Sequence, residues 1–170
     1  GQVVAEQDPS SVTREAVEAA LDTLRGTIQQ TPPMFSALKR DGRRLYDLAR
    51  SGVEVERAPR EVEISRLEMV QWAPPQLELE IECGRGAYIR SLAHDLGQQL
   101  GCGAHLVALR RLRTGPFHID DAVSIERFEE LFQEGSWQSA LYAPDYLVLH
   151  LKAISVSRVE ETMLQNGQPV

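Results

Sequence analysis

The segment that most constrains the fold is a run of strict alternation that ends at Cys83. From residue 77 to residue 82, leucine or isoleucine alternates one for one with glutamate. Successive side chains of a β-strand point to opposite faces, so this period of two predicts a half-buried strand with an acidic outer face. Residues 62–69 are also strand-like, with an irregular spacing that indicates a bulge, and Pro74-Pro75 indicates a turn between the two segments. Together they predict a β-hairpin.

Apolar residues at helical spacing lie on both sides of this hairpin in the sequence. The predicted helices cover residues 13–25, 45–50, 87–100 and 125–132. Thr13 and Ser124 precede two of them, as N-cap residues do, and Gly26 is suited to end the first. Two prolines make residues 31–34 an extended loop, and residues 105–112 are expected to be a further strand. Helices interspersed with hairpin strands predict an α+β fold, with a mixed, largely antiparallel sheet and flanking helices.

The composition is that of an ordinary globular chain. Of the 170 residues, 42% are hydrophobic and 25% are charged, and no segment approaches the run of about 20 apolar residues that a membrane helix needs. The first eight residues lack the pattern of a secretory signal. Cys83 and Cys102 belong to no C-x-x-C pair and the four histidines are scattered, so no metal site is expected. We therefore expect a cytoplasmic location, no membrane contact, and two cysteines that are small buried residues.

The distribution of charge is more informative than its sum. The formal net charge of −7 argues mildly against nucleic acid as a partner, because phosphate contacts need lysine and arginine. Four cations nevertheless fall within six positions, and no acidic residue occurs from residue 96 to residue 119. The cations of these two stretches are Lys39, Arg40, Arg43 and Arg44, then Arg110, Arg111 and Arg113. Two local basic patches on an acidic body are compatible with RNA binding.

Spacing alone gives few catalytic candidates. His94 and Asp95 are neighbours in a predicted helix, where adjacent side chains point in different directions, so they form no dyad. Tyr88 and Arg90 are more informative, because a planar aromatic beside a fixed guanidinium can stack on a base and orient a carboxylate. The other interpretation is a tyrosine that flanks the core and an arginine on the surface, and spacing alone favours it. On this basis the chain is a globular domain of mixed helices and strands with local basic patches.

Six segments change this interpretation through their order and spacing. They resemble, in turn, the motifs Q-x-P-P-x-Y-S-A-x-K, G-x-x-x-Y-x-x-A-R, C-S-K-G-T-Y-I-R-S-L, D-L-G, L-G-x-G-A-H and L-R-R of the TruB family of tRNA pseudouridine synthases. The segments are residues 30–39, 41–50, 83–92, 95–97, 100–106 and 109–112. The resemblance covers about residues 14–131. Its smaller departures from the family pattern are Phe35 in place of tyrosine and Ala87 in place of threonine.

The resemblance implies an activity and a substrate. The family isomerises uridine 55 in the T loop of tRNA to pseudouridine, with the target base flipped into a pocket and with no metal or organic cofactor. Tyr88 is then expected to line the pocket, Arg90 to pair with and orient the catalytic aspartate, and Leu109 to pack against the base. The expected phosphate contacts are Lys39, Arg40, Arg43, Arg44, Arg110 and Arg111. Tyr46 is expected to anchor its helix rather than contact RNA, and His105 to satisfy a hydrogen bond in the core.

Part of the family pattern has no counterpart in this sequence. The segment G-x-L-D-P-x-A-T-G, which supplies the nucleophilic aspartate, is absent, and so is the aromatic motif K-x-Y-x-V. None of Asp8, Asp41 and Asp95 has the required neighbours. Residues 1–4 resemble the end of the family stretch D-x-x-G-x-V, in mid-domain. We therefore expect a partial catalytic domain that is inactive alone and is completed by a missing N-terminal segment.

The resemblance also implies a division of the chain and leaves two functions open. Residues 1–145 are expected to be the later part of the catalytic domain, and residues 146–170 the start of a truncated C-terminal RNA-binding domain. The first functional hypothesis is a tRNA pseudouridine synthase, present here as a fragment. The alternative is a non-catalytic tRNA-binding or RNA-chaperone module. The Tyr-Ile-Arg motif favours the first, since a binder has no need of an arginine that orients a carboxylate.

Overall fold

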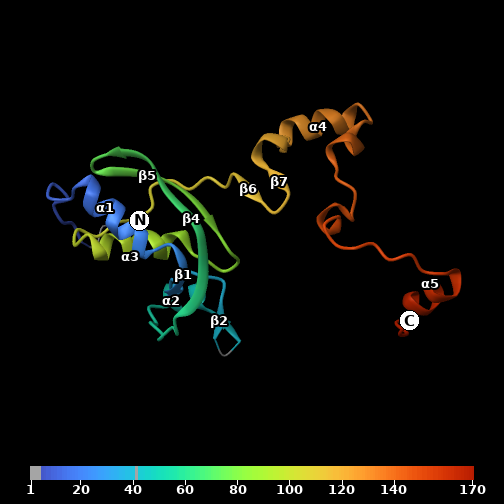
Figure 1. Cartoon of the computed structure of the whole chain (residues 1–170), viewed down its shortest axis with the longest axis horizontal. Coiled ribbons are helices and arrows are strands. Elements are labelled where there is room, and N and C mark those ends of the chain that lie inside the picture. Colours follow the sequence, from blue (N-terminus) through green and yellow to red (C-terminus); the bar gives the residue numbers. More distant parts are fainter. Residues whose placement is uncertain (1–4, 41) are drawn as a thin grey trace. The chain divides into compact units, whose positions relative to one another are not determined.

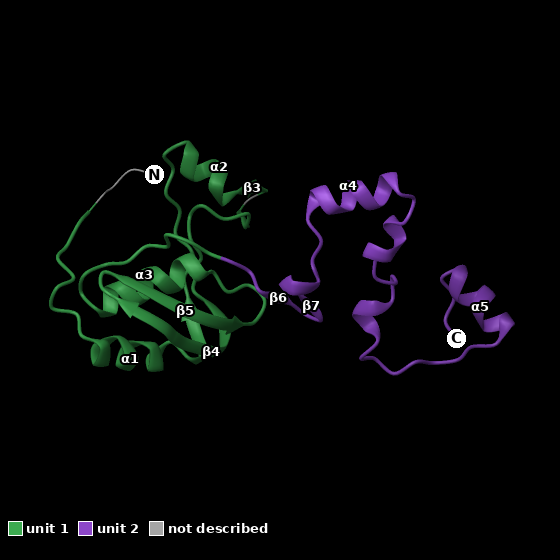
Figure 2. Ribbon diagram, turned by 90° about the horizontal axis from the view of Figure 1, so that it is seen from above, with its two compact units in different colours: residues 1–109 green, residues 110–170 purple. Residues whose placement is uncertain are grey.

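The computed structural model describes residues 5–40 and 42–170, which form two compact units (Figure 1, Figure 2). The first unit is Gly1–Leu109 and the second is Arg110–Val170. The expected division after residue 145 falls inside the second unit and, as a division by function, stays a prediction. Residues 1–4 and Asp41, which entered the resemblance above, lie outside the described residues. None of the helices in the described ranges is long and apolar enough to span a membrane.

An antiparallel sheet with the strand order β1-β4-β5 forms the centre of the first unit. The predicted hairpin is confirmed as β4 (Arg60–Ala73) and β5 (Gln76–Cys83), with Pro74-Pro75 at the turn. The predicted bulge is confirmed too, because the register shifts between Ile64 and Arg66. The apolar residues of β5 are partly buried against the core, as their alternation with glutamate requires.

Strand β1 (Gly26–Gln30) has no counterpart in the sequence-based expectation, in which Gly26 only ends a helix. Gly26 has a φ of 78°, a left-handed conformation that glycine adopts without strain. It therefore turns the chain from α1 (Arg14–Thr23) directly into the sheet, where β1 pairs with β4 along its whole length. The last residue of this strand, Gln30, is buried.

Helices α1 and α3 (Ile89–Gln99) pack with the sheet to form the core, and both confirm the sequence-based expectation. The hydroxyl of Thr13 caps α1 by accepting from the amide of Ala16. The Thr23 hydroxyl donates to Oε1 of Gln99 at 2.9 Å, which joins the ends of the two helices. The core residues are Val17, Ala20, Leu21, Leu24, Ile64, Leu67, Leu92 and Leu96. Burial of each large aliphatic side chain contributes about 1.5–3 kcal/mol, so this cluster holds the first unit together.

Between β1 and β4 the chain forms a loop, a small hairpin and a helix. Residues 31–38 have no regular structure, as their two prolines predict. Strands β2 (Lys39–Arg40) and β3 (Arg43–Arg44) follow, and then the predicted helix α2 (Leu45–Arg50). The amide of Tyr46 donates to the carbonyl of Ser36 at 3.1 Å, which fixes α2 to the loop before it.

The second unit contains short elements and little buried apolar surface. The predicted helix after Ser124 is confirmed as α4 (Ile125–Gln133). The other elements are β6 (Arg113–Thr114), β7 (Phe117–His118), the 3₁₀ helices η1 (Ile119–Asp121), η2 (Trp137–Ala140) and η3 (Tyr146–Val148), and α5 (Arg158–Gln165). Phe117, Tyr142 and Tyr146 form an aromatic cluster, with ring centroids 4.4 to 5.5 Å apart. Among the described residues of this unit, Leu131 is the one buried hydrophobic side chain.

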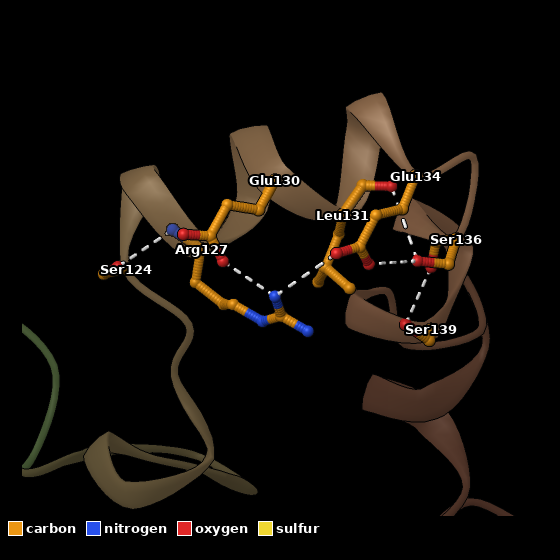
Figure 3. Close-up of polar contacts among 7 residues, drawn as sticks. All are labelled: Ser124, Arg127, Glu130, Leu131, Glu134, Ser136 and Ser139. Carbon is orange, nitrogen blue, oxygen red and sulfur yellow. Dashed lines mark hydrogen bonds and ion pairs between the residues drawn. The ribbon is translucent and has the colours of Figure 1, made fainter.

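Polar contacts fix both ends of α4 (Figure 3). Ser124 caps its start, as predicted, by accepting from the amide of Arg127 at 3.1 Å. The Arg127 guanidinium lies 2.7 Å from a carboxylate oxygen of Glu130 and 3.9 Å from one of Glu134. At the other end, the Ser136 hydroxyl lies 3.4 Å from the Glu134 carboxylate. The charge of Arg127 is therefore already paired within this unit.

Three expectations are wrong. Residues 105–112 are irregular rather than a strand, because they form no ladder with any described strand, and an apolar pattern supplies no hydrogen-bond partner by itself. Cys83 is exposed because it is the last residue of β5, an edge strand of the described sheet; Cys102 is half-buried. His105 lies in the irregular segment and is exposed, so it satisfies no hydrogen bond in a core.

Candidate functional site

A glycine turn brings Tyr88 and Arg90 to the start of α3. Gly86 follows the end of β5 and has a φ of 90°, which lets the chain turn from strand to helix. Tyr88 is the N-cap residue, extended in conformation and half-buried, while Arg90 is the second helical residue and exposed. The predicted position of both residues at the start of a helix is confirmed.

Two hydrogen bonds join this turn to the end of β1 and the loop after it. The amide of Tyr88 donates to Oε1 of Gln30 at 2.7 Å. The Ser91 hydroxyl donates to the carbonyl of Thr31 at 2.9 Å. Two motifs that are separate in the sequence therefore form one site. Apart from the presence of both motifs, nothing in the sequence signals this contact.

The guanidinium of Arg90 is held by the same loop. Its Nη2 donates to the carbonyl of Phe35 at 2.8 Å. A guanidinium carries five N–H donors in a fixed fork, so the others can bind a carboxylate bidentately. Within the described part of the chain, no carboxylate forms an ion pair with Arg90. The arrangement can thus receive a carboxylate.

Strands β2 and β3 form a ribbon of four cations, which we call the basic hairpin (residues 39–44). Lys39 lies opposite Arg44 and Arg40 opposite Arg43, and all four side chains are exposed. Gly42 lies in the turn with a φ of 80°. No carboxylate of residues 5–40 and 42–170 pairs with any of the four. The predicted cluster is therefore present as a surface that attracts anions.

Tyr46 lies between two arginines beside this hairpin. Arg44 donates from Nη1 to the Tyr46 hydroxyl at 2.8 Å, and the guanidinium carbons of Arg44 and Arg50 lie 5.7 and 5.6 Å from the ring centroid. Cation–π contacts of this kind contribute about 0.5–1 kcal/mol at exposed sites. The half-buried ring fits the predicted anchor role. The spacing of four between Tyr46 and Arg50 is the sequence signal for one contact, and nothing in the sequence marks the other.

The remaining predicted residues follow α3. Leu109 is the last residue of the first unit, and its side chain is 68% exposed. Arg110 and Arg111 open the second unit and are exposed. Nη1 of Arg111 donates to the hydroxyl of Thr114 at 3.2 Å. The expected contacts of Leu109 with the base and of both arginines with RNA stay predictions.

Two described aspartates have shifted pKa values for different reasons. Burial raises the pKa of Asp95 in α3, and the neighbouring His94 lowers it by less. Hydrogen bonds from the Ser10 hydroxyl and amide, at 2.7 and 2.9 Å, lower the pKa of Asp8. Neither carboxylate pairs with Arg90. Across the residues that the structure describes, no group of three or more His, Cys, Asp or Glu side chains could hold a metal ion.

Comparison with known proteins gives matches along most of the chain. Residues 1–89 match the family model described as "TruB family pseudouridylate synthase (N terminal domain)" and residues 90–153 match "tRNA pseudouridylate synthase B C-terminal domain". The tRNA pseudouridine synthase B of Stutzerimonas stutzeri (strain A1501) is 47% identical over 170 residues, which cover 98% of this chain and 56% of that protein. The protein of the same name from Geobacter sulfurreducens is 43% identical over 169 residues, which cover 99% of this chain and 56% of that protein. The chain thus spans about 56% of the length of these relatives.

The fold also matches a solved structure. A chain in the "Crystal Structure of a Cbf5-Nop10-Gar1 Complex" aligns with a TM-score of 0.66 and 25% sequence identity. The alignment covers 83% of this chain and 40% of that one. The α+β fold expected from the sequence is therefore confirmed by both the elements and the structural match.

Proposed function

The chain belongs to the TruB family of pseudouridylate synthases, and from this premise we propose that it is part of a cytoplasmic tRNA pseudouridine synthase that acts on uridine 55 of the T loop. One observation carries the proposal: the last residue of β1 and the loop after it hold the backbone of Tyr88 and the guanidinium of Arg90 at the start of α3. The name shared by the matched relatives, tRNA pseudouridine synthase B, supports the same activity and substrate.

The residues of the turn have distinct roles in the proposed reaction. The target uridine is flipped out of the T loop into a pocket that Tyr88 lines. Arg90 pairs with the catalytic aspartate and keeps it ionised and aimed at the reacting base and ribose. The bond from N1 to the ribose breaks, the base rotates, and C5 joins the ribose; C5 loses a proton and N1 gains one, so the product is an isomer. Leu109 packs against the base.

The basic hairpin supplies phosphate contacts in this proposal. Its four exposed cations form a ribbon whose charges no described carboxylate pairs with, which is the property that phosphate binding needs. Arg110 and Arg111 add further contacts from the second unit. The substrate is the T-stem loop of tRNA, and residues 146–170 begin an RNA-binding domain.

The catalytic aspartate comes from an N-terminal segment. The 170 residues contain no G-x-L-D-P-x-A-T-G motif, and no described carboxylate pairs with Arg90. This same observation favours the second candidate function, a non-catalytic tRNA-binding or RNA-chaperone module. Such a module needs the basic hairpin but makes no use of Arg90 as an orienting group.

The test is tritium release from tRNA labelled at uridine C5. The chain is assayed alone and together with a segment that carries the aspartate motif. A tRNA with cytidine in place of uridine 55, labelled at its remaining uridines, controls for the target position, and a segment with asparagine in place of the aspartate controls for chemistry.

We expect no release from the chain alone and release on complementation, which both controls abolish. Binding of tRNA without release under any complementation would support the non-catalytic module instead. Release from the purified chain alone would show that the nucleophile lies within these 170 residues.

A further inference from the structure

Gln30 is an unusual residue to find at the end of a strand, because its polar side chain is only 1% exposed. Its neighbour Gln29, on the same strand, is exposed to solvent. A buried amide is unfavourable unless it makes hydrogen bonds. Among the described residues Nε2 of Gln30 has no hydrogen-bond partner, whereas Oε1 has one. That partner is the backbone of Tyr88, whose amide lies 2.7 Å from Oε1 of Gln30 across 58 positions of sequence.

The start of α3 depends on this contact. Tyr88 is the N-cap residue, and its own side chain makes no capping hydrogen bond. Its backbone amide is one of the first four of the helix, which have no acceptor within the helix, and it donates to Gln30. Ser91, one turn further on, reinforces the contact by donating to the carbonyl of Thr31, the residue after Gln30. Two side-chain hydrogen bonds thus set where the Tyr-Ile-Arg segment lies relative to the sheet.

We propose that Gln30 is a positioning residue for the synthase reaction, which acts by fixing the backbone of Tyr88 and through it the ring of Tyr88 and the guanidinium of Arg90. This inference rests on the proposed function. The loop that follows Gln30 also holds Arg90 through the Phe35 carbonyl, so the Tyr88 backbone and the Arg90 side chain are both fixed to the end of β1 and the loop after it. Displacement of a reacting group by about 1 Å can cost roughly 10²-fold in rate, which gives the backbone contact its importance.

Gln30→Met tests the role, because methionine has nearly the same length and no hydrogen-bonding amide. Gln29→Met is the matched control on the exposed side of the same strand. Gln30→Glu keeps an oxygen that can accept from Tyr88 and is the rescue variant. Each is assayed by tritium release with the complementing segment, and the exchange rate of the Tyr88 amide is followed by NMR in the chain.

We expect Gln30→Met to lower kcat by roughly ten- to hundredfold with KM within about twofold of wild type, and to speed exchange at Tyr88. Gln29→Met should change neither, and Gln30→Glu should restore most of kcat. Faster exchange with an unchanged kcat would overturn the positioning role. A kcat loss that Gln30→Glu fails to restore, with a lowered melting temperature in both variants, would mean general destabilisation and would overturn it as well. An inactive wild-type complex would instead overturn the proposed function, so the two failures are distinguishable.

Discussion

At the scale of single residues, Arg90 carries the most specific hypothesis. One N–H of its guanidinium is bound by the Phe35 carbonyl, which limits how the fork can turn. A fixed fork is suited to orient a carboxylate, whereas phosphate binding at a surface needs only charge. The two functions proposed above therefore predict different effects of the same substitution.

Replacement of Arg90 by alanine in the complemented enzyme should abolish most activity and leave tRNA binding nearly intact. In the complemented enzyme the substitution removes one partner of the proposed charge pair, which costs about 3–5 kcal/mol for a pair closed off from water, so we expect kcat to fall by roughly 10²–10⁴-fold. Arg90→Lys keeps the charge but loses the bidentate geometry and should recover little of the rate. Single-turnover tritium release and tRNA binding by filter retention measure the two effects. If binding collapsed together with activity in a folded variant, the orienting role would be wrong.

The pKa of Asp95 leads to a prediction about how the stability of the folded protein depends on pH. Burial raises its pKa in the folded state above the ordinary value of 3.8, so the folded protein holds this proton to higher pH than the unfolded chain does. The free energy of unfolding therefore falls as pH rises through the folded-state pKa. Asp95→Asn removes this loss. The free energy of unfolding of the variant minus that of wild type should therefore be more positive at pH 7 than at pH 3. Urea unfolding at both pH values measures the difference.

Glu68 provides the control of opposite sign. Its hydrogen bond to Arg66 lowers its pKa, so its contribution is present at neutral pH and is lost as pH falls through the folded-state pKa. For Glu68→Gln, the free energy of unfolding of the variant minus that of wild type should be more negative at pH 7 than at pH 3. If the difference in free energy of unfolding between Asp95→Asn and wild type were the same at both pH values, burial would not raise the pKa of Asp95 in the folded protein.

At the scale of elements, α3 is held against the segment that follows it by a backbone contact. A Cβ built on Gly97 would lie 2.1 Å from the amide nitrogen of Ala104 and 2.3 Å from the carbonyl carbon of Gly103. The amide of Gly103 also donates to the carbonyl of Gly97 at 2.9 Å. Two of the motifs that carry the family resemblance, D-L-G and L-G-x-G-A-H, are thus two sides of one contact.

Gly97→Ala should destabilise the first unit strongly. The new methyl group would meet backbone atoms, which cannot move aside as a side chain can, so we expect the free energy of unfolding to fall by about 2–3 kcal/mol or more. Gln98→Ala, on the exposed side of the same helix, is the control and should change stability by less than about 0.5 kcal/mol. Thermal unfolding followed by circular dichroism compares the two. A Gly97→Ala protein as stable as Gln98→Ala would show that the segment after α3 is not packed as described.

How far the sequence predicted these elements depended on whether their signals were local. The hairpin β4–β5 and the helices α1, α2, α3 and α4 were predictable, because alternation, helical spacing and caps act over a few residues. Strand β1 was not, because its pairing with β4 is set by residues 30 to 38 positions away. The strand predicted at residues 105–112 was wrong for the same reason, since an apolar pattern does not indicate whether a partner strand exists.

The same distinction between local and distant signals applies to the residues of the candidate site. Tyr88 and Arg90 were found from their position at a helix start and the four cations from the distribution of charge, with their roles implied by the motifs, and the structure has each at a helix start or on an exposed ribbon. Gln30 was quoted only as one letter of a motif, because its burial and its bond to Tyr88 arise from the fold. The contact of Arg44 with Tyr46 was missed, since it forms where β3 turns into α2 and no regular spacing predicts it there.

At the scale of the whole molecule, an acidic chain presents a local basic surface. The net charge of −7 repels RNA at long range, and at physiological salt this repulsion is screened beyond about 8 Å. Binding of tRNA then depends on the few cations that touch phosphate, and its affinity should depend steeply on salt.

Replacement of Lys39 and Arg43 by alanine should therefore weaken tRNA binding and flatten its salt dependence. Removal of each phosphate-binding cation should lower the slope of log K against log salt by about 0.7–0.9. Arg127→Ala is the control, because the charge of Arg127 is already paired with Glu130 (Figure 3). Fluorescence anisotropy at several salt concentrations gives the slopes. A slope unchanged by the double substitution would place the RNA-binding surface elsewhere.

The division into two units also has an optical consequence. The chain has two tryptophans, and each unit contains one: Trp72 in β4, packed against the core, and Trp137 in η2, whose ring centroid lies 6.5 Å from that of Phe132. Each unit thus has its own intrinsic fluorophore. In a Trp137→Phe protein the emission reports on the sheet and its helices, and in a Trp72→Phe protein it reports on the region of α4. Thermal unfolding of each unit can therefore be followed separately, through the tryptophan emission of the variant that keeps the tryptophan of that unit, without an added label.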